Sequence, residues 1–304
     1  MMDTNKKSAT INFCKFHGFG NDYIIIENKE LKAFENLGEF TKRICHRNTG
    51  VGSDGIAVLK KSENETADYA CRIINPDGSE AGFSGNGTRC AVAYLYYKNL
   101  WSSENLKLIT WSGVKNYQLL EREENTFWFR AELGKPKFDL PDSHLKIFFQ
   151  ANKSQVNSYP LGLYEEGIVF DFFFVDVGNP VACIFVQDFS PFVGDSQSFE
   201  WQVIGQKIES TREMFPKRTN VVFIKIIDRE NIEIRIWERG AGETSSSGTC
   251  SIAAAVASAF TEKTERKVSV HAEGGTTEAV WREDDEMLIT GRADLVFCGE
   301  WFEK

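Results

Sequence analysis

The chain has 304 residues, of which 42% are hydrophobic and 26% are charged, and its formal net charge is −9 at pH 7. This length allows one large domain or two of about 150 residues, each with a core of its own. The acidic charge disfavours nucleic acid or an anionic membrane as the main partner, since both select clustered lysine and arginine. No apolar run approaches the roughly 18 residues of a membrane span.

The opening segment 1–10 is polar and lacks the apolar core of a signal peptide, which predicts a cytoplasmic protein. The seven cysteines form no CxxC pair, and there are only four histidines, so no metal site is expected. Buried, reduced thiols are the expected state of the cysteines.

The first half of the chain predicts short strands with two helices between them. Strands are expected where apolar residues alternate or run between turn residues, at 11–28 around a turn at 18–22, then at 55–60, 69–74, 106–109, 117–121 and 126–133. Helices are expected at 34–46 and, rich in alanine and tyrosine, at 88–98. Gly134-Lys135-Pro136 closes this half as a helix and strand breaker.

The second half repeats this pattern. Its expected strands are 167–177, 181–186, 220–227, 232–237, 268–272, 277–281, 287–291 and 294–302, with helices at 199–209 and 249–259. Each half is therefore mostly strand with one central alanine-rich helix. We predict two similar α/β domains with a cleft between them.

Both alanine-rich helices begin after a serine and a glycine, at Ser84-Gly85-Asn86 and at Ser247-Gly248-Thr249. The first turn of a helix has unpaired N–H groups and carries the positive end of the helix dipole. It can therefore bind an anion such as a carboxylate. Two such helix starts facing one cleft would bind a small charged molecule from both sides.

Several motifs together make the chain resemble the diaminopimelate epimerase family, cofactor-independent isomerases that interconvert LL- and meso-diaminopimelate in lysine biosynthesis. The matching segments are FHGFGNDY (16–23), GVGSDG (50–55), NPDGSE (75–80), GNGTRC (85–90), GNP (178–180), FPKRTNV (215–221) and ERGAGET (238–244). They follow the family's order and span nearly the whole chain.

The resemblance implies an α/β (α+β) fold of two pseudo-symmetric domains, each a barrel-like, mostly antiparallel sheet around a central helix. Because the last strand often returns to the first domain in this family, we expect one domain at 11–134 with 289–304 and the other at 135–288. A small amino acid like diaminopimelate is the implied partner, without a cofactor, metal, nucleic acid or membrane. Whether the chain forms a homodimer is left open.

The resemblance also implies the substrate contacts. They are Asn21, Asn75, Asn179 and Asn220, the pair Glu238 and Arg239, and the helix starts Gly85-Asn86 and Gly248-Thr249. An arginine fork suits the distant carboxylate of a diamino dicarboxylate. Neutral amides can bind ammonium and carboxylate groups without adding net charge.

The chain departs from the family at the reacting positions. Ser84 and Ser247 stand where the family has two cysteines that take and deliver the α-proton on opposite faces of the substrate, and Val181 replaces a histidine that assists one of them. A helix start can bring a thiol pKa towards neutrality. An aliphatic hydroxyl is a far weaker acid and needs a neighbouring base.

Three interpretations of the two serines stay open. They are an engineered pair that holds substrate without turnover, a natural relative that uses carboxylates for isomerisation or elimination, and a non-catalytic paralogue that binds an amino acid. The candidate carboxylates are Asp77, Glu80, Glu238 and Glu243. Cys90 and Cys250 lie inside the helices, and we expect both to be core residues rather than displaced catalytic thiols.

Overall fold

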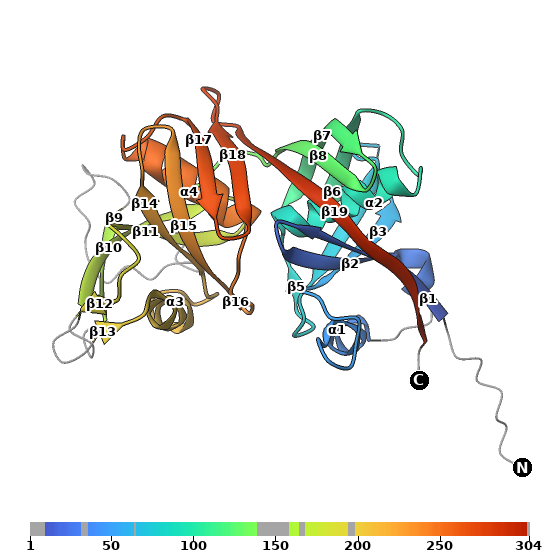
Figure 1. Cartoon of the computed structure of the whole chain (residues 1–304), viewed down its shortest axis with the longest axis horizontal. Helices are drawn as coiled ribbons and strands as arrows, with labels where there is room; N and C mark the ends of the chain where they lie inside the picture. Colours follow the sequence, from blue (N-terminus) through green and yellow to red (C-terminus); the bar gives the residue numbers. More distant parts are fainter. Residues whose placement is uncertain are drawn as a thin grey trace, which may run out of the picture.

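The computed structural model describes residues 10–31, 36–63, 65–138, 158–163, 168–193 and 198–302. Two groups of strands lie next to each other, and each surrounds one central helix (Figure 1). The predicted α/β (α+β) class with two pseudo-symmetric halves is confirmed. No helix among the described residues is long and apolar enough to cross a bilayer.

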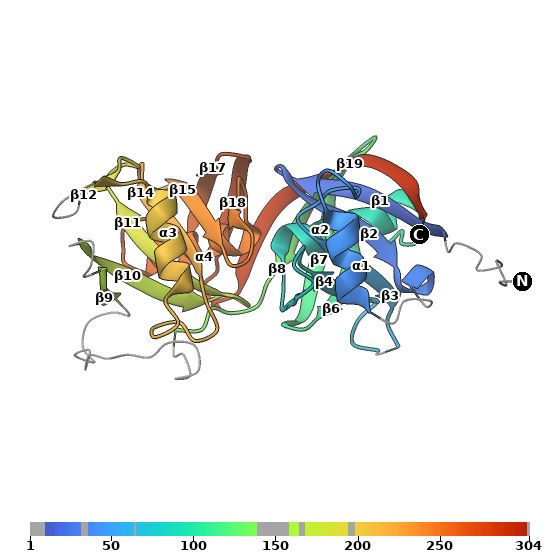
Figure 2. The same ribbon diagram turned by 90° about the horizontal axis from the view of Figure 1, so that it is seen from below.

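Strands of the first half close into a ring around helix α2 (Gly85–Tyr97). In order around the ring these strands are β1 (Thr10–Gly18), β2 (Asn21–Glu27), β3 (Ile56–Lys61), β4 (Tyr69–Ile74), β6 (Asn105–Thr110), β7 (Gly113–Glu123), β8 (Thr126–Glu132) and β19 (Met287–Phe302). Residues 85–96 of α2 are all buried, because the helix is enclosed by the sheet on its sides (Figure 2).

The second half repeats the connections of the first around helix α4 (Gly248–Phe260). Its main strands are β10 (Ile168–Asp176), β11 (Pro180–Val186), β14 (Asn220–Ile226), β15 (Asn231–Glu238), β17 (Lys267–Ala272) and β18 (Gly275–Trp281). The parallel pairs β2–β3 and β4–β6 correspond to β11–β14 and β15–β17. Helices α1 (Leu37–Cys45) and α3 (Trp201–Ser210) connect the first parallel pair of each half, and α2 and α4 connect the second.

Strand β19 joins the two halves. Its residues 288–290 pair with both β18 and β8, and from 294 onward it pairs with β1 in the first half (Figure 1). The two strands expected at 287–291 and 294–302 are one continuous strand, so that expected break is wrong. The domain boundaries at 11–134 with 289–304 and at 135–288 stay a prediction.

Helices α2 and α4 begin earlier than expected, at Gly85 and Gly248 rather than at 88 and 249. The reason is capping. Ser84 accepts a hydrogen bond from the N–H of Gly87 at 3.0 Å, and Ser247 accepts one from Cys250 at 3.4 Å. Helix α1 starts after Asn36, and residues 34 and 35 of its expected span lie outside the described residues.

Short elements were not expected from the sequence. They are η1 (Asn28–Leu31), β5 (Glu80–Ala81), β9 (Ser158–Leu163), β12 (Phe192–Val193), β13 (Ser198–Phe199) and β16 (Gly242–Glu243). Strands β5 and β16 occupy matching places, since each lies just before a central helix.

The expectation of seven reduced cysteines is wrong for one pair. Cys14 on β1 and Cys298 on β19 stand opposite each other in the antiparallel register and form a disulfide. The sequence could not show this, because the two residues are separated by 284 positions and the register is set by tertiary pairing. The remaining cysteines are free and buried, as expected: Cys45, Cys71, Cys90, Cys183 and Cys250.

Candidate active site

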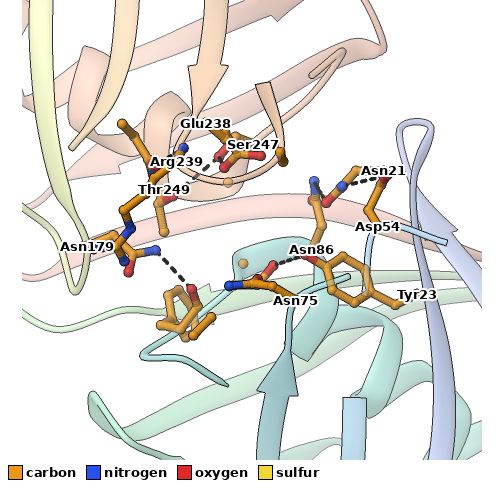
Figure 3. Close-up of a pocket in the computed structure, with 17 residues that line it drawn as sticks. Asn21, Tyr23, Asp54, Asn75, Asn86, Asn179, Glu238, Arg239, Ser247 and Thr249 are labelled. Carbon is orange, nitrogen blue, oxygen red and sulfur yellow. Dashed lines mark hydrogen bonds between the residues drawn. The ribbon is translucent and has the colours of Figure 1, made fainter. Parts of the chain in front are cut away.

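One pocket between the two halves brings together every site residue predicted from the sequence. Its lining includes Asn21, Asn75, Ser84, Gly85, Asn86, Asn179, Asn220, Glu238, Arg239, Ser247, Gly248 and Thr249 (Figure 3). Sequence reasoning missed the other lining residues, which are Tyr23, Asp54, Ala81, Phe83 and Ala241. Tyr23 lies within a motif that we quoted, and so does Asp54, but nothing in either motif identified them as pocket residues.

The two helix starts meet at this pocket. A Cβ atom added to Gly85 would lie 3.1 Å from the Cα of Gly248, and one added to Gly248 would lie 3.2 Å from the Cα of Gly85. A side chain at either position would therefore push the two backbones apart, and glycine allows this close approach. Both positive helix ends, with their unpaired N–H groups, are directed at one small volume, which favours an anionic ligand there.

The hydroxyl of Ser84 has a second partner from strand β2. The Tyr23 hydroxyl lies 2.9 Å from Ser84 Oγ, and Tyr23 is only 6% exposed. Burial and the nearby negative charge of Glu238 hold the pKa of the Tyr23 phenol above its usual value. Tyr23 is therefore a neutral hydrogen-bonding group at physiological pH.

Ser247 is bound to a carboxylate instead. Its Oγ donates a hydrogen bond to Glu238 Oε1 at 2.5 Å, and Thr244 Oγ1 donates to the other oxygen of Glu238 at 3.1 Å. Burial raises the pKa of the Glu238 carboxyl, although these two hydrogen bonds oppose the shift. A carboxyl group with a raised pKa in a pocket suits proton transfer near neutral pH.

Of the four carboxylates considered from the sequence, the pocket lining includes Glu238 alone. Asp77 accepts hydrogen bonds from Ser79, and Glu80 pairs with Arg72. Glu243 is an exposed residue of the short strand β16. The interpretation that carboxylates carry the chemistry is thereby narrowed to Glu238.

Asn21 and Asn86 are held in one hydrogen-bonded chain. Asn86 Nδ2 donates to Asn21 Oδ1 at 3.2 Å, and Asn21 Nδ2 donates to Asp54 Oδ2 at 2.8 Å. Asp54 in turn accepts from Arg47 Nη2 at 2.6 Å. These contacts fix the orientation of both amides before any ligand arrives, which reduces the entropy cost of binding.

On the opposite side of the pocket, Asn220 and Arg239 are joined by a hydrogen bond. Asn220 Oδ1 accepts from the backbone N–H of Arg239 at 2.9 Å, and Arg239 Nη1 donates to the carbonyl of Lys217 at 3.0 Å. The guanidinium of Arg239 forms no ion pair with a carboxylate of the described residues. This half-buried cation is therefore available for a carboxylate of a ligand.

Two more amides reach the pocket. Asn179 Nδ2 donates to the carbonyl of Phe83 at 2.9 Å, a contact between the two halves (Figure 3). Asn75 Nδ2 donates to Ser79 Oγ at 3.0 Å. Neither amide oxygen has a hydrogen-bond partner within the described ranges, so each can accept a hydrogen bond from an ammonium group.

Val181 and the helix cysteines do not contribute to the pocket. Val181 is fully buried in β11 and packs in the core, so this position offers no imidazole to the pocket. Cys90 and Cys250 are fully buried in the same core, which confirms their expected structural role. Burial raises the pKa of Cys90 to about 12, so its thiol is protonated and unreactive at neutral pH.

Comparison with known proteins agrees with this geometry. The family model for diaminopimelate epimerase matches residues 13–138 and 173–296. The chain is 36% identical over 292 residues to diaminopimelate epimerase of Pelotomaculum thermopropionicum, covering 96% of this chain and 99% of that protein. It is 35% identical over 292 residues to the enzyme of the same name from Moorella thermoacetica, with 96% and 99% covered.

A solved structure shares the fold at low identity. A hydroxyproline epimerase from Agrobacterium vitis with bound trans-4-hydroxy-L-proline superimposes with a TM-score of 0.70 and 11% identity, covering 97% of this chain and 93% of that one. The fold and these relatives define an isomerase of the amino-acid racemase and epimerase type. The chain belongs to the diaminopimelate epimerase family.

Proposed function

We propose that the chain binds diaminopimelate, or an amino acid very like it, in this pocket and inverts the configuration at its α-carbon. The observation that carries this proposal is the meeting of two helix starts beside Arg239, which pairs with no carboxylate in the part of the chain that the structure describes. A diamino dicarboxylate has one carboxylate for each of these positive sites. Cytoplasmic localisation stays a prediction.

The pocket's charges orient the ligand. The carboxylate next to the reacting carbon accepts hydrogen bonds from the N–H groups of Gly85-Asn86 and Gly248-Thr249. Arg239 binds the carboxylate at the far end. The asparagine amides accept hydrogen bonds from the ammonium groups. Two helix dipoles at the α-carboxylate also stabilise the negative charge that develops when the α-proton leaves.

Proton transfer uses the positions of Ser84 and Ser247. An unassisted hydroxyl cannot serve as a base at neutral pH, because its pKa is far too high. On one face the base is the Glu238 carboxylate, which accepts a 2.5 Å hydrogen bond from the Ser247 hydroxyl. Glu238 accepts a proton either directly from the substrate or through the Ser247 hydroxyl.

A second candidate function is a non-catalytic protein that binds an amino acid on the same scaffold. Two observations favour it. Both positions of the family's thiols hold hydroxyls, and the position of the assisting histidine holds Val181 in the core. Such a protein would keep the carboxylate and ammonium contacts and lack proton transfer.

Solvent-deuterium incorporation separates the two candidates. The chain is incubated in D₂O with LL-diaminopimelate and, separately, with the meso form, and the α-position is followed by NMR and chiral chromatography. We expect deuterium at the α-carbon and interconversion of the two forms. Binding of diaminopimelate in calorimetry with neither exchange nor inversion would instead establish the non-catalytic function.

A further inference from the structure

We infer that Tyr23 carries the proton on the Ser84 face of the substrate, opposite the Glu238 already proposed for the Ser247 face, so the two halves of the pocket use different chemical groups. This inference rests on the proposed function. It assigns a role to Tyr23, a pocket-lining residue whose phenol hydroxyl lies 2.9 Å from Ser84 Oγ.

The two serines are structurally equivalent but chemically unequal. Each caps a central helix, and each hydroxyl has a second partner from a neighbouring strand. For Ser247 that partner is a carboxylate, which can only accept a proton while it is ionised. For Ser84 the partner is the Tyr23 phenol, which both donates and accepts. A neutral phenol is the stronger proton donor of the Tyr23–Ser84 pair.

Two glycines leave the room that the Tyr23 ring occupies. A Cβ atom on Gly87 would lie 2.9 Å from Tyr23 Cε1, and one on Gly55 would lie 3.0 Å from the same atom. Any larger residue at either position would displace the ring. The two glycines thus allow the phenol to reach Ser84 from β2 with its position fixed by packing.

The charges of the two proton carriers are coupled. Ionised Glu238 raises the pKa of Tyr23, which keeps the phenol protonated as long as Glu238 is a carboxylate able to act as a base. When Glu238 takes a proton, that negative charge disappears and the phenol becomes a better donor. Proton uptake on one face therefore favours proton delivery on the other.

The proposed step is balanced in protons. The α C–H bond breaks on the Ser247 face as that proton passes to the Ser247 hydroxyl and the serine's own proton passes to Glu238. On the opposite face the Ser84 proton bonds to the α-carbon, and the Tyr23 proton replaces it on Ser84. Once the product has formed, Glu238 is neutral and Tyr23 is a phenolate. Proton exchange with water then returns Glu238 to the carboxylate and Tyr23 to the phenol. The reverse reaction uses the phenolate as the base.

Two isosteric variants test this assignment. Tyr23→Phe removes only the phenol oxygen, and Glu238→Gln keeps the size of the carboxylate side chain. Each variant and the unaltered chain are incubated in D₂O with the LL form and, separately, with the meso form. We expect inversion to fall by about 10²- to 10⁴-fold in both variants, the usual contribution of a general acid or base.

The exchange pattern distinguishes proton transfer from a structural role. In Tyr23→Phe, the epimer whose α-hydrogen faces Ser247 should still exchange with retention of configuration, whereas the opposite epimer should lose exchange. Glu238→Gln should give the mirror-image pattern. A residue that only supports the fold would reduce exchange of both epimers equally.

Tyr94→Phe is the matched control, because Tyr94 is a buried tyrosine of α2 whose hydroxyl donates to Glu27 at 3.0 Å, outside the pocket. It should retain inversion and exchange. Equal loss of exchange from both epimers in Tyr23→Phe, or retained inversion, would overturn the role of Tyr23 while leaving the proposed function intact. An unaltered chain that neither exchanges nor inverts diaminopimelate would overturn the proposed function and this role together.

Discussion

Replacing Arg239 with alanine is expected to weaken binding of diaminopimelate by about 2–5 kcal/mol, the usual effect of truncating one partner of a buried charge pair. This corresponds to a dissociation constant raised by at least roughly 30-fold. The cause is that the far carboxylate of the ligand would lie in the pocket without its cation. Calorimetric titration of the two proteins measures the difference.

Two controls make this prediction specific to the far carboxylate. The free amino acid lysine lacks that carboxylate, so Arg239→Ala should change the affinity of the chain for lysine little. Arg235→Ala removes an arginine of β15 that pairs with Glu233 and Glu273 and does not line the pocket. It should leave diaminopimelate binding unchanged. An unchanged dissociation constant for diaminopimelate in Arg239→Ala would place the ligand elsewhere.

Restoring thiols at both helix starts is expected to raise the rate of inversion by about 10²-fold or more, within the range of general acid–base catalysis. A thiol at a helix start ionises far more readily than a hydroxyl. The double variant Ser84→Cys with Ser247→Cys should therefore exceed either single variant, because inversion needs a proton carrier on each face. Chiral chromatography of the products over time gives the rates.

The control for added thiols is Ser251→Cys, a buried position of α4 outside the pocket lining. This variant should show no gain. If the double variant also shows none, the loss of the family's histidine at Val181 or the shape of the pocket limits the reaction instead of the serines. A gain in Ser251→Cys as large as that of the double variant would contradict the assignment of Ser84 and Ser247 as the acid/base positions.

The order of strands and helices could be predicted because apolar periodicity is a local signal. The continuity of strand β19 could not be predicted in this way. The sequence predicted a break near Gly291, whereas the strand continues there because β8 pairs with it and Arg89 packs against the glycine. A Cβ atom at Gly291 would lie 2.9 Å from the guanidinium carbon of Arg89, so this glycine serves close packing and not a turn.

Residues that line the pocket were named from the sequence where a motif carried them, and were missed where only tertiary packing brings them to the pocket. The helix starts at Ser84 and Ser247 were visible as a serine and a glycine before an alanine-rich run. The contact of Tyr23 with Ser84 joins residues 61 positions apart, and that of Asn21 with Asp54 joins residues 33 apart. Such contacts depend on how segments distant in the sequence pack together, which no local pattern specifies.

The most direct measurement is a crystal structure of this chain with bound diaminopimelate. We expect one carboxylate at hydrogen-bond distance, about 3 Å, from the N–H groups of both helix starts, with the other carboxylate on Arg239. The α-carbon should lie between the hydroxyls of Ser84 and Ser247. A ligand bound outside this pocket, or one with both hydroxyls on the same side of its α-carbon, would contradict inversion at this site.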